Sequence, residues 1–295
     1  MQIGLALTVL LLGVPLAVGA VAWVGARNEP APSVKPDWHL SWLSLLTYVL
    51  AFNITFFIQE LFLVVPKAFV PGLRPILYHN NHDWLGHSPL AELFQGTGAL
   101  SILISGLIFA ALAQRSEKRS SSTRLFFVWM AYNGLFQSLP QWAFAAVTPG
   151  NDTSRAFDYF HLSFAAQLAI GLVAAAAMIA AGFFMTRRFL ELGEPEWIEN
   201  GRARALFALR VAVIPAILAI PLLVAFRVPR EWGEVVIPTI AVPLGGLIWV
   251  QALSWRTTVT PRPVSGLRHL LWPAVLVLGL LAVFQLVLRP GIRFY

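Results

Sequence analysis

Apolar stretches recur along the whole chain and are separated by short segments rich in charge, proline and glycine. A stretch of about 20 apolar residues can cross the hydrocarbon core of a bilayer as a helix. The stretches are continuous and do not alternate, which favours helices over barrel strands. The pattern predicts eight spans, at residues 2–25, 40–66, 94–113, 125–147, 158–186, 206–226, 235–254 and 269–288.

Composition supports this pattern, since 58% of the 295 residues are apolar and only 12% are charged. None of the connecting segments is long enough to form a second domain. We therefore expect an all-α protein, a polytopic transmembrane helical bundle of about eight spans in a single integral membrane domain, residues 1–295. Its first partner is then the lipid bilayer. The first span is long for a signal peptide and lacks a basic segment before it, so it is expected to be retained.

The net charge of +7 comes from basic residues in short loops, which fix topology and do not indicate nucleic acid as a partner. The positive-inside bias predicts a plasma (inner) membrane location with both termini on the non-cytoplasmic side. Of the 21 Lys and Arg residues, the loops after odd-numbered spans hold Arg27, Lys35, Arg115, Lys118, Arg119, Arg124, Arg187, Arg188, Arg202, Arg204, Arg256, Arg262 and Arg268.

The second span contains Asn53, Gln59 and Glu60. An ionised carboxylate in the middle of a bilayer costs roughly 2.5 to 3.5 kcal/mol. Glu60 must therefore be neutral, paired or close to water. Its position near the end of the span places it below the outer surface, and Asn53, seven residues earlier, lies on the same helix face.

The fourth span carries Asn133, Gln137 and Gln141 at intervals of four residues, which predicts a polar stripe along one side of the helix. Amides in this position stabilise bundles through hydrogen bonds between helices. We expect them to form a structural polar cluster with Asn53 and Gln59.

The segment "HNNHDWLGH" concentrates three of the six histidines in nine residues between the second and third spans. Histidine and carboxylate side chains at such spacings can bind zinc. The candidate metal ligands are His79, His82, Asp152 and His161, with Glu60 as the candidate catalytic residue. The alternative is a solvated loop in which these side chains bind no metal.

Two segments resemble the intramembrane zinc metalloproteases of the site-2 protease family. In that family a membrane helix carries His-Glu-x-x-His, and a later helix carries an Asn and a Pro before a ligand Asp. Here "FFIQELFLVVPKAF" places Glu60 at the position of the glutamate, and "YNGLFQSLPQWAFAAVTPGND" contains Asn133, Pro140 and Asp152. The resemblance extends over roughly 100 residues and implies a related helical bundle.

The resemblance also shows what this chain lacks. Two histidines one turn apart are needed to bind one zinc ion, and Gln59 and Leu63 occupy those positions. The resemblance thus implies a non-catalytic or accessory membrane protein, a subunit or partner in a larger membrane assembly, with no cofactor expected. The alternative is a metal-dependent membrane hydrolase or metal-handling protein with zinc at the non-cytoplasmic end.

Two further patterns concern helix packing and shape. Small residues at Gly98, Ser101, Ser105 and Gly106 predict a close approach between helices. Spans six and seven each carry a pair of prolines, in "AVIPAILAIPLLVAF" and "VVIPTIAVPLGGLIW". Such pairs bend membrane helices, or alternatively mark the discontinuous helices of a transporter.

Overall fold

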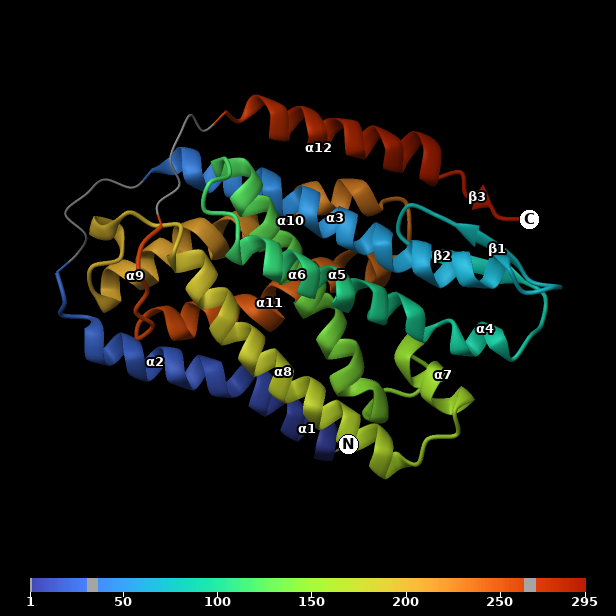
Figure 1. Cartoon of the computed structure of the whole chain (residues 1–295). Coiled ribbons are helices and arrows are strands. Elements are labelled where there is room, and N and C mark those ends of the chain that lie inside the picture. Colours follow the sequence, from blue (N-terminus) through green and yellow to red (C-terminus); the bar gives the residue numbers. More distant parts are fainter. Residues whose placement is uncertain (1, 31–36, 263–268) are drawn as a thin grey trace.

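The computed structural model describes residues 2–30, 37–262 and 269–295, and nearly all of its regular structure is helical (Figure 1). The helices are α1 (Gln2–Thr8), α2 (Val14–Ala26), α3 (Trp38–Ala68), α4 (Leu90–Leu93), α5 (Gly96–Gln114), α6 (Ser121–Phe144), α7 (Asp152–Tyr159), α8 (Phe164–Leu190), α9 (Gly201–Ala208), α10 (Ile214–Arg227), α11 (Trp232–Ser254) and α12 (Leu271–Val283). Single π-helical turns join α1 to α2 and α9 to α10, and another extends α12 to Leu288.

The membrane class predicted from the sequence is confirmed. Among the described residues, seven helical stretches are long and apolar enough to cross a membrane, and they match seven of the eight predicted spans. The remaining span, predicted at 125–147, corresponds to α6, which has 24 residues. Its polar side chains lower its mean hydropathy, yet it packs against α3, α5, α8 and α11 in the interior of the bundle.

An aromatic core surrounds α6. The indole of Trp129 lies 4.6 Å from the Tyr48 ring of α3 and 4.8 Å from the Phe189 ring of α8, measured between centroids. Tyr132 contacts Trp129 edge-on, and its hydroxyl donates to the carbonyls of Val242 and Pro243 on α11. These contacts hold α3, α6, α8 and α11 together.

The small residues of the third span permit the close approach predicted for them. A Cβ atom added to Gly134 on α6 would lie 2.5 Å from the Gly106 Cα atom on α5, and one added to Gly98 would lie 2.7 Å from Leu63 Cγ. At Gly106 and Gly134, only glycine allows the backbones of α5 and α6 to come this close.

Prolines in the helices leave backbone carbonyls unpaired one turn earlier, because proline has no N–H. Side chains from other elements donate to four of these carbonyls. Thr97 Oγ1 donates to Phe62 O before Pro66, Trp249 Nε1 to Leu11 O before Pro15, Ser44 Oγ to Val211 O before Pro215, and Arg227 Nη2 to Glu234 O before Pro238. The helices continue through these prolines, which favours bent helices over broken transporter helices.

Three short strands lie outside the spans, and the sequence pattern did not predict them. The sheet has the order β2 (His82–Leu85), β1 (Arg74–Leu77), β3 (Ile292–Arg293), with antiparallel pairing throughout. Leu77 pairs with His82, and Ile76 pairs with Arg293. The histidine segment is therefore partly a hairpin strand, and the C-terminal tail binds to this chain's own β1.

The predicted start of the fifth span, at residue 158, is wrong. The chain forms α7, then turns at His161, which has a φ of 52°, and begins α8 at Phe164. Asn151 Oδ1 caps α7 by accepting from the Ser154 N–H, and Ser163 Oγ caps α8 by accepting from the Ala166 N–H. Each cap marks the start of a separate helix. The apolar pattern alone did not distinguish α7 from α8.

The strands and α7 lie towards the same end of the bundle (Figure 1). β3 pairs with β1 there. A Cβ on Gly4 of α1 would lie 3.7 Å from a Val147 methyl group, just after α6. The C-terminal ends of α2, α8 and α11, after which many of the basic residues follow, lie at the opposite end (Figure 1).

Candidate functional site

A buried cluster of polar side chains lies where α3 meets the β1–β2 hairpin. Glu60, on the last third of α3, is 5% exposed, and its Oε2 atom lies 2.8 Å from His82 Nδ1. His82 is the first residue of β2, and the pairing of β2 with β1 directs it towards α3. Glu60 is therefore paired by the hairpin, which is one of the three environments expected for it.

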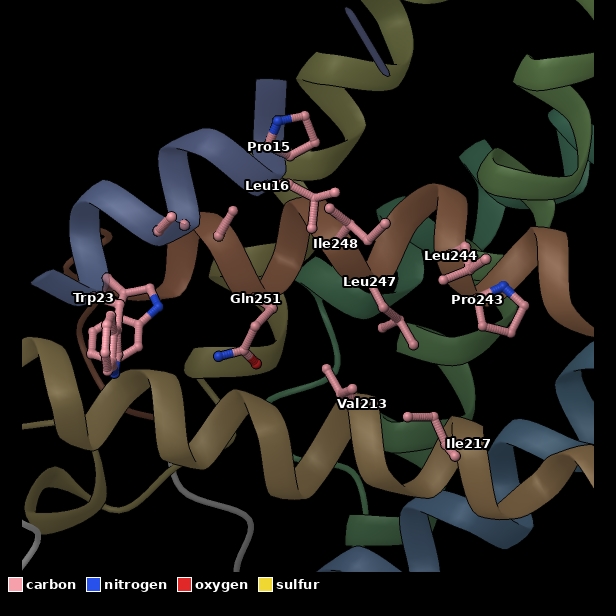
Figure 2. A pocket seen from close by; sticks show the side chains of 14 residues that line it. Pro15, Leu16, Trp23, Val213, Ile217, Pro243, Leu244, Leu247, Ile248 and Gln251 are labelled. Carbon is pink, nitrogen blue, oxygen red and sulfur yellow. The ribbon is translucent and has the colours of Figure 1, made fainter. Parts of the chain in front are cut away.

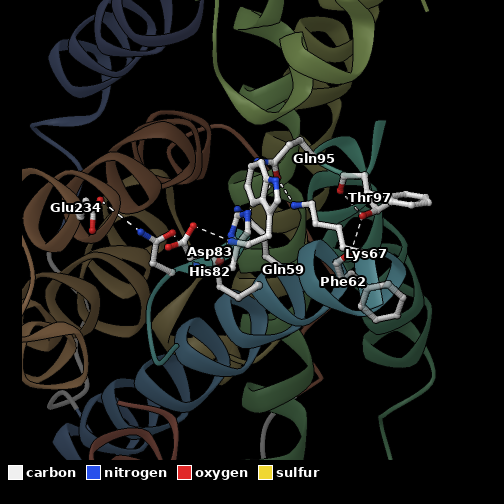
Figure 3. Close-up of polar contacts among 12 residues, drawn as sticks. Gln59, Phe62, Lys67, His82, Asp83, Gln95, Thr97 and Glu234 are labelled. Carbon is white, nitrogen blue, oxygen red and sulfur yellow. Dashed lines mark hydrogen bonds and ion pairs between the residues drawn. The ribbon is translucent and has the colours of Figure 1, made fainter. Parts of the chain in front are cut away.

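Gln95 and Lys67 extend the cluster (Figure 3). His82 Nε2 lies 3.1 Å from Gln95 Oε1, and Lys67 Nζ donates to the same oxygen at 3.1 Å. The Lys67 ammonium also lies 4.1 Å from the centre of the Trp84 ring, and its side chain is fully buried. This cation–π contact compensates part of the cost of burying the charge.

The hydrogen bonds constrain where the protons lie. Lys67 is a donor only, so the Gln95 oxygen faces it, and His82 Nε2 must then carry a hydrogen to donate to that oxygen. At Nδ1, either the imidazolium donates to an ionised Glu60, or a protonated Glu60 donates to the imidazole. The Glu60–His82 pair is neutral overall in both forms, as a site of low dielectric favours.

Asp152 and Arg155, on α7, approach the same cluster from the other side. Burial raises the pKa of the Asp152 carboxyl, while the positive charges of His82, Lys67 and Arg155 act in the opposite direction. Arg155 Nε donates to Glu92 at 2.6 Å, and its guanidinium lies 5.4 Å from the Trp84 ring. The tertiary structure thus brings α7 next to β2 and α4.

His79 and Asn80 bind the C-terminal end of another helix, α10. His79 Nε2 lies 3.1 Å from the carbonyl of Arg227, the last residue of α10, and Asn80 Nδ2 donates to that carbonyl at 2.8 Å. The buried Arg227 guanidinium donates to Glu234 O and lies 4.1 Å from the centre of the Phe56 ring. Burial lowers the pKa of His79. Its bond to the Arg227 carbonyl raises the pKa, but by less. His79 therefore caps α10 and does not point at Glu60.

Four of the five predicted amides form a hydrogen-bonded ladder. Gln141 Nε2 donates to Gln59 Oε1 at 3.1 Å, and Gln137 Nε2 donates to Asn133 Oδ1 at 3.2 Å. Gln141 also donates to the Gln137 carbonyl. The ladder joins α6 to α3 at Gln59, not at Glu60. Asn53 lies outside it, because its amide donates to the Val49 carbonyl of its own helix.

The predicted zinc ligands are not arranged around one point. Within the described part of the chain, no three His, Cys, Asp or Glu side chains are placed to hold a metal ion. Both ring nitrogens of His82 are occupied, His79 caps α10, and His161 is exposed in the turn before α8. The nearby Lys67 ammonium would also repel a cation. The side chains present do not fit zinc.

Sequence reasoning overlooked Lys67 and Gln95, although both complete the cluster. Lys67 offered a signal, since it is a cation within the helix that carries Glu60. Gln95 and Trp84 offered none, because their role depends on the hairpin folding back over α3. Comparison with family models, with curated proteins and with solved structures finds no match for this chain.

Proposed function

We propose that the chain is a non-catalytic integral membrane protein that acts as an accessory subunit of a larger membrane assembly. One observation supports this most directly. The side chains of Glu60, His82, Gln95 and Lys67 are buried, and their polar groups bond to one another. A general base or metal ligand needs a lone pair that substrate or metal can reach. Here the cluster ties the hairpin, α3 and α5 together instead.

The likeness to the site-2 protease layout fits this proposal. Gln59 and Leu63 stand where that family has its zinc histidines, and both have structural roles in this chain. Gln59 bonds to α6 through Gln141, and Leu63 is fully buried against the Gly98 position of α5. We further propose, from the distribution of basic loops, that the termini and the polar cluster face the non-cytoplasmic side of a plasma (inner) membrane.

Blue native electrophoresis of membranes from the source organism, extracted in mild detergent, tests the accessory role. The tagged chain should migrate in a complex well above its own 32.5 kDa, and Glu60→Gln should still enter that complex. Migration of the wild-type chain alone, after cross-linking in intact membranes, would contradict the proposal.

Elemental analysis of the purified chain tests the alternative, a metal-dependent hydrolase. About one zinc per chain, lost in the double variant His79→Ala with His82→Ala, would support that alternative and overturn ours. The control is His39→Ala with His269→Ala, which removes two exposed histidines that are not candidate ligands. We expect zinc well below one equivalent in all three proteins.

A further inference from the structure

A groove runs beside α12, although the helix also packs against α3. It has a volume of about 810 Å³ and lies between α12, α3 and the first turns of α6. Most of its walls are apolar, with Leu50 and Ile54 on α3 and Leu276 and Leu280 on α12. Leu276 is 58% exposed, so the groove opens towards the surrounding membrane.

Polar side chains line the groove near the start of α6. Ser120, Ser122 and Thr123 provide hydroxyl groups, and His269 provides an imidazole. The loop that leads into Ser120 carries Arg115, Lys118 and Arg119, all exposed. The groove is thus apolar along its length, with hydroxyls and positive charge where the basic loops lie.

Two other hollows on the membrane-facing surface have no hydroxyl or imidazole side chain among their described lining residues. The hollow between α2, α10 and α11 has a volume of about 440 Å³ and is apolar except for Gln251 and two indoles (Figure 2). The Gln251 amide donates to the Ala205 carbonyl. A hollow over α5, α6 and α8 carries Gln114 among apolar residues. The hydrocarbon chains of any lipid can cover such surfaces, whereas the α12 groove has hydroxyl and imidazole groups at one end, beside a loop with three basic residues.

We propose that the α12 groove binds one anionic diacyl phospholipid from the leaflet next to the basic loops. Its acyl chains would lie between α12 and α3. Its phosphate would meet the hydroxyls at the start of α6, the His269 imidazole and the cations of residues 115–119. Clusters of Lys and Arg attract anionic lipid headgroups, and a volume of this size lies within the usual range of ligand sites.

Native mass spectrometry with added lipids tests the apolar part of the groove. The detergent-purified chain should retain one phosphatidylglycerol and bind it about tenfold more tightly than phosphatidylcholine. Gly279→Phe should reduce this binding about tenfold or more, because Gly279 lines the groove and a Cβ there meets nothing within 4 Å. The control, Gly25→Phe, makes the same change on exposed α2. Equal binding by Gly279→Phe and wild type would overturn the proposal.

Charge reversal tests the headgroup end independently. Lys118→Glu with Arg119→Glu should remove the preference for phosphatidylglycerol over phosphatidylcholine. Arg27→Glu with Arg256→Glu, which reverses two other exposed arginines, should preserve it. A preference that survives the first pair of changes contradicts the proposal.

The natural absence of cysteine allows one more test. A single Leu276→Cys chain, treated with a thiol cross-linker in native membranes, should form no link to another protein. A cross-linked protein partner at this position would place a helix in the groove, and the lipid proposal would fail.

Discussion

His82 Nδ1 lies 2.8 Å from Glu60 Oε2, although the two residues are 22 positions apart and belong to a strand and a membrane helix. Their contact fixes the hairpin to α3. It also explains how a carboxyl group is tolerated inside an apolar helix, because an imidazole that the chain itself supplies pairs with it.

The Glu60–His82 pair should show energetic coupling. Glu60→Gln and His82→Gln each leave a buried polar group incompletely paired, at a cost of about 1–3 kcal/mol in the free energy of unfolding. The double variant should cost less than the sum of the single changes. Unfolding in mixed micelles measures these values. The half-buried Glu92–Arg155 pair, which is more exposed than Glu60–His82, is the control, where the coupling should be about 0–1 kcal/mol.

Asp152 should make stability depend on pH. Because burial raises its pKa in the folded protein, the folded state binds the proton more tightly than the unfolded state. The contribution of Asp152 to stability is therefore greatest at low pH and falls as pH rises from the ordinary range of aspartate through the raised value. Asp152→Asn should flatten this fall and raise the melting temperature near neutrality. Melting curves between about pH 4 and pH 8 measure it, with the exposed Asp83→Asn as the control.

Gly134→Ala should destabilise the bundle. The added Cβ would lie 2.5 Å from the Gly106 Cα atom, so α5 and α6 must move apart, at a cost of about 1–3 kcal/mol. Gly279→Ala, where a Cβ meets nothing within 4 Å, should leave the melting temperature unchanged or slightly higher. Equal melting temperatures for the two variants would contradict the close packing of α5 and α6.

Ser44→Ala should lower the free energy of unfolding by more than the loss of one small hydroxyl group suggests. Its hydroxyl donates to the Val211 carbonyl and accepts from Trp129 Nε1, so its loss leaves two buried groups unpaired. We expect a loss of about 1–3 kcal/mol. Ser101→Ala is the matched control, because the buried Ser101 hydroxyl donates only to the Gly98 carbonyl of its own helix. Thermal unfolding of both variants in the same detergent compares them.

The polar residues show how far sequence reasoning reaches into the site. The interval of four residues in α6 predicted an amide stripe, and Gln137 bonds to Asn133 along it. The same reasoning could not tell that Gln141 would meet Gln59 while Glu60 meets His82. Neighbouring residues on α3 point in directions about 100° apart, so small rotations of the helix decide which partner each one meets.

The sequence by itself determined that this is a multi-pass helical membrane protein. A continuous apolar stretch inside a bilayer satisfies its backbone hydrogen bonds by forming a helix. It also showed that Glu60 must be neutral, paired or close to water. Only the tertiary structure decided that the partner of Glu60 is His82, that His79 caps α10 and that no zinc ligands converge within the described residues. Those outcomes depend on a hairpin folding over the end of α3, and contacts between residues far apart in the chain leave no periodic signal in the sequence.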